Sequence, residues 1–268
     1  QALAAVVIAA VSALAAAPWL EPRAGDLALV LAPSPETAVA DQIVVAAITE
    51  ETLAGFPYRS PIDRAFLAGL IERLDAAGAR TIGLDILIDQ PSDQQKDARF
   101  FQALDASATP VVLALATRDH GLTDRQADYV ARAIAPRPAG LIALARDEID
   151  GVLRHLPGAR PGMATFAQVL AGAGPEMPSG RILYSRAIND ASPFPLYPAH
   201  LIAQLPDDWF AGKVVLIGTD LPTIDRHPTP MTTLDGSAAG TLPGVVIHAH
   251  ILAQALAGLS LRPLSPLA

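Results

Sequence analysis

The feature that most constrains the fold is a series of short apolar runs separated by segments with helical spacing. Residues 43–48 and 213–218 are almost entirely aliphatic and lack the alternating polar residues of a sheet with one face in water. Runs of this kind are typical of strands buried on both faces. Helical segments between such strands indicate right-handed βαβ units. We therefore expect an α/β fold with a mostly parallel, mixed central sheet flanked by helices.

The remaining elements follow from the same periodicities. Pro61, with Ser60 as N-cap, is expected to open a helix of apolar residues at helical spacing, and Gly78 to end it. A turn signal at residues 147–151 separates two short strands, so we expect some antiparallel strands from the middle of the chain. Further strands are expected at residues 81–87, 110–115, 140–144, 151–156 and 181–185, and further helices at 97–104, 123–135, 163–171 and 246–256.

The first residues of the chain have the character of a membrane segment. Residues 1–17 carry no charge, and a helix of that length reaches about 25 Å, slightly less than the ~30 Å hydrocarbon core of a bilayer. We expect residues 1–20 to be an apolar, membrane-proximal helix derived from a signal anchor, followed by one domain over residues 38–260. Two alternatives stay open: a cleavable signal peptide and a buried, alanine-rich helix.

Charge and cysteine content exclude some partners. The formal net charge is −8 and the chain has no basic patch to neutralise phosphates, so we expect no nucleic-acid partner. The chain has no cysteine, so its fold relies on its core. With 51% hydrophobic residues in 268, that core can be large.

Three stretches carry a family resemblance. The first begins with Phe-Pro-Tyr-Arg at residues 56–59 and leads through Arg64 and the Gly-Ala at 78–79 into the strand at 81–87. The second is the turn Asp-Gly-Val-Leu-Arg at 150–154. The third combines the Gly-Lys-Val-Val-Leu-Ile-Gly at 212–218, the Asp-Arg-His-Pro-Thr-Pro at 225–230 and the Leu-Pro-Gly-Val-Val-Ile-His-Ala at 242–249. In this order the stretches resemble the CHASE2 family of extracytoplasmic sensory domains in bacterial receptors.

The resemblance covers roughly residues 40–260 and implies an architecture. It implies a membrane helix before the domain, and further membrane helices with a cytoplasmic output domain after it. The output is expected to be a nucleotide cyclase first and a kinase second, so the domain would be periplasmic and anchored in the cell membrane. A homodimer is expected because such outputs generally work as dimers.

Polar residues at the expected strand ends give the candidate site. In a parallel sheet, ligands bind outside the carboxyl ends of the strands. Reading outward from those ends gives Thr49 and Glu50, Asp85, Thr117 and Arg118, then Thr219 and Asp220, followed by a loop that carries Asp225 and His227. The expected ligand-binding residues are Arg59, Arg64, Asp85, Thr219, Asp220, Asp225 and His227. An arginine there would favour an anionic small molecule. The alternative is that Asp85 and Thr219 cap helices or turns.

Catalytic, metal and cofactor chemistry find little support in the sequence. No Gly-X-Ser-X-Gly elbow or P-loop is present, so we expect no enzyme and no cofactor. His248 and His250 lie at an expected helix start, where residues two apart face different sides, so no metal site is expected. Two alternatives to a ligand sensor remain: a dimerisation module without a small ligand, and an extracytoplasmic hydrolase that uses Asp85 and Asp225.

Overall fold

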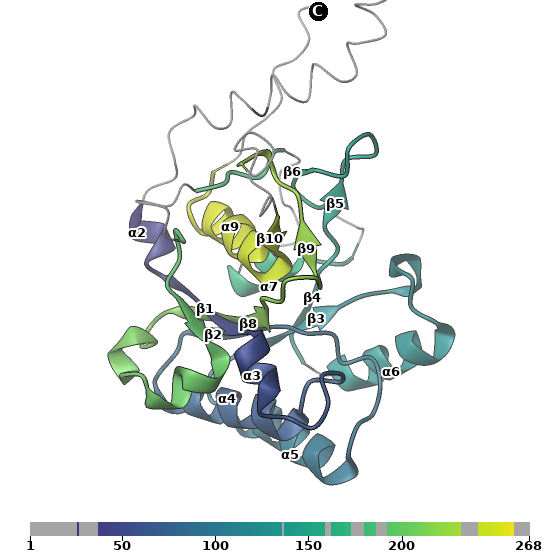
Figure 1. Ribbon diagram of the computed structural model, residues 1–268, viewed down its shortest axis with the longest axis vertical. Coiled ribbons are helices and arrows are strands. Elements are labelled where there is room, and N and C mark those ends of the chain that lie inside the picture. Colours follow the sequence, from purple (N-terminus) through teal and green to yellow (C-terminus); the bar gives the residue numbers. More distant parts are fainter. Residues whose placement is uncertain are drawn as a thin grey trace, which may run out of the picture.

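The protein folds into three layers around a six-stranded parallel sheet (Figure 1). The computed structural model describes Asp26 and residues 37–259, except 136, 159–161, 173–179, 186–191 and 232–240. The sheet has the order β4-β3-β2-β8-β1-β7, and each of its neighbouring pairs is parallel. Its strands are β1 (Ile43–Ile48), β2 (Thr81–Asp85), β3 (Val111–Leu115), β4 (Ala139–Leu141), β7 (Leu196–Pro198) and β8 (Val214–Thr219).

Helices cover both faces of this sheet. Figure 1 shows α4 and α5 below it and α7 and α9 above it. The described α-helices are α2 (Thr37–Ala40), α3 (Glu50–Ala54), α4 (Arg64–Ala76), α5 (Gln94–Ala106), α6 (Asp124–Ile134), α7 (Phe166–Leu170) and α9 (Gly244–Leu256). The α/β class expected from the sequence is therefore confirmed.

The two faces of the sheet belong to two separate hydrophobic clusters, because side chains alternate along a strand. In β1, Val44 and Ala46 join the cluster that includes α4 and α5. Val45 and Ala47 join the cluster that includes α7 and α9. All six residues of β1 are buried, which explains why the strand has no polar alternation.

Antiparallel pairing occurs, but outside the central sheet. β5 (Ala145–Arg146) pairs with β6 (Leu153–His155), and β9 (Arg226–His227) pairs with β10 (Leu242–Pro243). The expected mixed central sheet is thus wrong in one respect: the middle of the chain forms its own two-stranded sheet. In the expected strand 181–185, the structure gives only an isolated bridge between Arg181 and His155.

The helix at residues 64–76 begins later than expected. α4 begins at Arg64 rather than at Pro61, because the carboxylate of Asp63 accepts hydrogen bonds from the backbone N–H groups of Ala65 and Phe66 and so acts as the N-cap. The expected apolar helix at residues 1–20 lies outside the described residues. Within the described part of the chain, no helix is long and apolar enough to cross a membrane.

Candidate functional site

A cavity of about 330 Å³ opens where β2 and β8 end. Its position agrees with the general rule that open parallel sheets bind ligands beyond the carboxyl ends of their strands. Four of the seven predicted site residues line it, together with aliphatic side chains and the start of α9. The described lining residues are Asp85, Ile86, Leu87, Ile142, Leu144, Thr219, Asp225, His227, Gly244 and His248.

The parallel pairing of β2 with β8 brings two polar strand ends together. Asp85 is the last residue of β2 and pairs with Gly218, directly before Thr219 at the end of β8. A side chain on Gly218 would have no room, since an added Cβ would lie 2.6 Å from the Cβ of Val245. Glycine at this position therefore lets the start of α9 pack onto the carboxyl end of the sheet.

Asp225 enters the cavity from the loop before β9. Its φ of 52° is in the left-handed region, which Asp tolerates better than most residues. Its carboxylate lies over Gly244, where an added Cβ would be 2.2 Å from Oδ2. The backbone N–H of Gly244 also donates to the carbonyl oxygen of Asp225, at 3.0 Å. The loop and the first residue of α9 are thus fitted to each other.

His227 connects Asp225 to Arg146 through its two ring nitrogens. The guanidinium of Arg146 can only donate, so its 2.9 Å contact assigns His227 Nδ1 as an acceptor. The proton then lies on Nε2, which donates to Asp225 Oδ1 at 2.8 Å. Burial is the largest single influence and opposes the ionisation of Asp225, but His227, His248 and the backbone of Gly244 together outweigh it, so the pKa of Asp225 lies below its usual range.

Asp85 is a buried carboxyl group without a hydrogen-bond partner in the described part of the chain. Its side chain is 6% exposed, and its nearest ionisable contact, His248 Nε2, is 3.8 Å from Oδ1, beyond hydrogen-bonding distance. Burial, followed by the negative charge of Asp225, raises the pKa of Asp85 to about 8. Neither Asp85 nor Thr219 is the N-cap of a described helix.

The two histidines of α9 face different sides, as helical spacing predicts. His248 is one turn after Gly244 and therefore points to the same side, toward Asp85 and Phe166. Its Nδ1 is buried without a partner in hydrogen-bonding geometry, although the nearby Ile142 backbone slightly favours its protonated form. Burial nevertheless lowers the pKa of His248 to about 4.

His250 belongs to a different environment. Its Nδ1 accepts a 3.1 Å hydrogen bond from the backbone of Ser185, and its ring packs edge-on against Tyr184 and Phe194. Burial lowers the pKa of His250 to about 3. In the described residues, no group of three His, Cys, Asp or Glu side chains could hold a metal ion.

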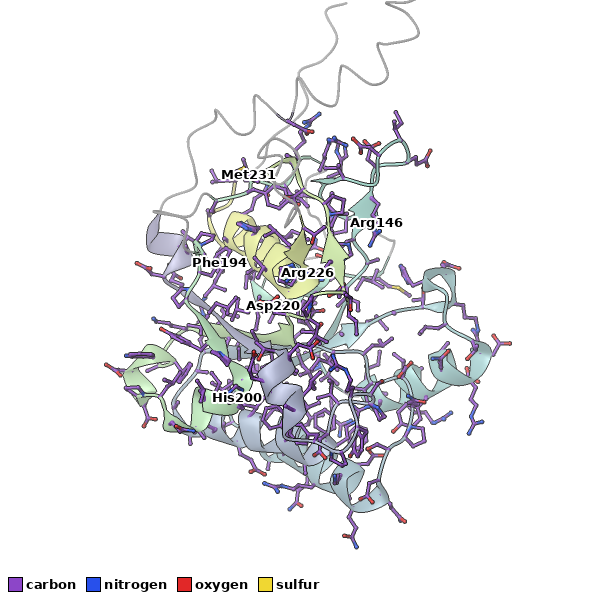
Figure 2. The ribbon with its side chains drawn as sticks, in the orientation of Figure 1. Arg146, Phe194, His200, Asp220, Arg226 and Met231 are labelled. Atoms are coloured by element: carbon purple, nitrogen blue, oxygen red, sulfur yellow. The ribbon has the colours of Figure 1, made fainter. Side chains whose placement is uncertain are left out.

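Three predicted site residues do not line the cavity. Asp220 forms an ion pair with Arg226, at 3.0 Å, and Figure 2 shows these two side chains next to each other. Arg59 is on the surface, where its two terminal nitrogens hold the carboxylate of Glu50 at 2.6 and 2.7 Å.

The third, Arg64, is fully buried at the start of α4. It contacts the ring of Phe100, and its Nε is 3.7 Å from Asp97 Oδ1. Both predicted arginines are therefore paired with carboxylates outside the cavity.

Comparison with known proteins identifies the family. A family model described as the CHASE2 domain matches residues 2–267. The chain belongs to the CHASE2 family. CHASE2 domains are extracellular sensory domains, so this CHASE2 domain is a sensor in an extracytoplasmic location rather than a catalytic unit. Neither a comparison with curated proteins nor one with solved structures returned a match.

The stretches that resemble CHASE2 domains have distinct structural roles here. Residues 225–230 and 242–249 form β9, β10 and the start of α9, and so build one wall of the cavity. The turn at 150–154 forms a buried ion cluster instead. Arg154 is 1% exposed and donates to both carboxylate oxygens of Asp26 and of Asp150, at 2.7 to 2.8 Å.

Sequence reasoning missed part of the cavity of this CHASE2 domain. The sequence pattern raised His248 only as a metal ligand, although its position one turn after Gly244 could have placed it at the strand ends. The role of Arg146 behind His227 had no signal in the sequence, because 81 residues separate the two. The aliphatic wall from Ile142 and Leu144 was also missed. The sequence predicted that both residues belong to a strand over 140–144, whereas β4 ends at Leu141 and the two residues lie beyond the sheet, at the cavity.

Proposed function

We propose that this CHASE2 domain binds a small ligand in the cavity at the ends of β2 and β8, and that binding regulates a cytoplasmic output. The observation that carries the proposal is the carboxyl group of Asp85. Its side chain is 6% exposed and lines the cavity, and its oxygens accept no hydrogen bond within the described chain. A group of this kind at the wall of a cavity is what a ligand with a matching donor would satisfy.

A thermal-shift experiment on the full 268-residue chain in detergent tests the ligand proposal. The panel contains amino acids, sugars, organic acids, amines, nucleotides and metal salts. We expect at least one class to raise the melting temperature in proportion to the logarithm of its concentration, as mass action requires. The rise should disappear in Asp85→Asn and persist in Asp41→Asn, which makes the same substitution at an exposed site.

The outcomes separate binding in this cavity from binding elsewhere on the domain and from the absence of binding. A rise that survives in Asp85→Asn would place the ligand elsewhere and contradict the cavity assignment. No rise across the panel would favour the alternative function, a dimerisation module of the receptor that binds no small molecule.

The receptor around the domain is part of the same proposal. Family membership supports a receptor held in the cell membrane by helices that flank the domain, with a periplasmic sensor and a nucleotide cyclase, or secondly a kinase, as output. We propose that the receptor works as a homodimer. Sedimentation of the detergent-solubilised chain tests this proposal, because a monomer at all concentrations would contradict it.

A further inference from the structure

The described wall of the cavity has negative and neutral groups but no cation. Asp85 and Asp225 line it, and no lysine or arginine is among its described lining residues. Arg146 is not among the described lining residues: its guanidinium contacts the Nδ1 edge of His227, whose Nε2 edge faces Asp225. Among the described lining residues, an anion in the cavity would therefore meet the charge of Asp225 with no cation to offset it.

The polar groups of the cavity wall also differ in whether they already have a hydrogen-bond partner. The Nε2–H of His227 is used by Asp225, whereas the carboxyl oxygens of Asp85 accept no hydrogen bond within the described chain. An ionised carboxyl group can accept several hydrogen bonds. In its ionised form Asp85 therefore needs hydrogen-bond donors, and a donor that carries positive charge would also offset the field of Asp225.

The rest of the lining decides between an inorganic and an organic cation. Ile86, Leu87, Ile142 and Leu144 give the cavity an aliphatic side, which contributes to binding only if the ligand has carbon atoms to place against it. The described residues also provide no group of three side chains that could hold a metal ion. Both observations favour an organic ligand.

We infer that the cavity selects a small aliphatic amine, whose ammonium group pairs with Asp85 while its carbon chain packs against the aliphatic side. This inference rests on the proposed function, since it assigns a chemical class to the ligand of the same cavity. It also differs from the anionic ligand that an arginine in the site would have favoured, because Arg59 and Arg64 do not line the cavity.

The surroundings of Asp85 make amine binding dependent on pH. The ionisable groups that face it are Asp225 and His227 from the β9 region and His248 from α9. Asp85 has a pKa of about 8, so it is mostly protonated at neutral pH and must lose its proton to pair with an ammonium group. The affinity for an amine should then rise roughly tenfold per pH unit below pH 8 and level off above it.

Three matched four-carbon probes test the inference: 1,4-diaminobutane, 1,4-butanediol and succinate. Each is titrated against the full chain by calorimetry between pH 6 and pH 9, and thermal shift gives an independent readout. We expect the diamine to bind, with the pH dependence given above, and the neutral diol and the dianion not to bind. Asp85→Asn should weaken diamine binding by tenfold or more, whereas Asp41→Asn should not change it.

A second variant guards against misfolding of the first. Asp225→Asn removes the charge but keeps a residue that tolerates positive φ, so the loop should keep its conformation. At pH 9, where Asp85 is mostly ionised with or without the charge of Asp225, we expect this variant to weaken diamine binding by a smaller factor than Asp85→Asn. Equal diamine affinity in wild type and both variants would overturn the inference by placing the amine outside the cavity.

Other outcomes distinguish the two proposals. If succinate or the diol binds in a way that depends on Asp85, the amine class is wrong and the ligand cavity stands. If none of the three probes binds at millimolar concentration, the amine class is also overturned. The wider panel then decides whether any other ligand uses Asp85.

Discussion

Asp225 and Gly244 show how closely single residues are fitted at this site. The carboxylate of Asp225 occupies the space that a side chain at position 244 would need, and it is held there by His227. Glycine at position 244 therefore leaves room for the carboxylate of Asp225, which comes from another segment of the chain.

Gly244→Ala should displace Asp225 and break its hydrogen bond with His227. We expect a loss of about 1–3 kcal/mol in the free energy of unfolding, measured by urea denaturation, because a partly buried charge loses its partner. The same substitution in an Asp225→Gly background should cost much less, since the colliding carboxylate is gone and glycine suits the positive φ. Equal costs in both backgrounds would show that the two residues do not interact.

The sequence predicts site residues well where backbone position alone decides. Asp85 and Thr219 were expected at the cavity because each ends a strand, and Asp225 and His227 because their loop follows the last strand directly. Arg59 and Arg64 were assigned to the site without such a constraint. A long arginine side chain is positioned by the partner it finds, and Glu50 and Asp97 are brought near only by the tertiary fold.

At the scale of elements, burial on both faces made the central strands predictable. β1 is found at the residues expected, and β8 is shifted by one residue. β7 was missed because its three residues are half-buried at the sheet edge and prolines at 193, 195 and 198 interrupt the apolar run around them. The predicted start of α4 was wrong because two residues that commonly cap helices, Ser60 and Asp63, lie three residues apart. Only the folded chain shows that Asp63 accepts the capping hydrogen bonds.

Gly140 in β4 tests how closely two elements approach. An added Cβ would lie 2.5 Å from Cα and 2.7 Å from N of Phe166, so the backbones of β4 and α7 would have to separate. Gly140→Ala should therefore lower the free energy of unfolding by about 1–3 kcal/mol. The control is Gly69→Ala in α4, where nothing lies within 4 Å and the helix should gain about 0.5–1 kcal/mol. Similar effects in the two variants would contradict the close contact.

Arg154 tests the ion cluster that joins β6 to Asp26. Arg154→Met would leave the buried carboxylate of Asp26 with only Arg181, whose Nη1 is 3.8 Å away, and we expect a loss of about 3–5 kcal/mol in the free energy of unfolding. The matched control is Arg118→Met, which also removes an arginine paired with two carboxylates, but at a site where the arginine side chain is 58% exposed. That change should cost less than about 1 kcal/mol. A small effect at both positions would show that the cluster contributes little.

For the molecule as a whole, the free energy of unfolding should depend on pH through two buried histidines, whose pKa values lie in acid, and one buried carboxyl group, whose pKa lies above neutrality. The pKa values of His248 and His250 are lowered from 6.5 to about 4 and about 3, so these residues stabilise the fold above pH 6.5 and lose that contribution on acidification. The pKa of Asp85 is raised from 3.8 to about 8, so its contribution is fully present below pH 4 and is lost as the pH rises toward 8.

Above pH 6.5, Asp85 is the one of these three groups whose titration changes the free energy of unfolding. Between pH 6.5 and 8, the free energy of unfolding should fall by up to about 1.4 kcal/mol per pH unit in the wild type. In Asp85→Asn this fall should be absent, while the loss in acid should remain. Urea denaturation at half-unit pH steps measures both slopes, and parallel curves for the two proteins would show that Asp85 is not the group that titrates.

α9 begins at the cavity and contacts α2, the helix at residues 37–40. A helix of 13 residues is about 20 Å long and behaves as a stiff rod along its axis. A movement along the helix axis of its first turn, where Gly244 and His248 lie, would therefore be carried to Leu256. If α2 keeps its place, such a movement would change the spacing between α2 and α9 whenever a small ligand alters the width of the cavity.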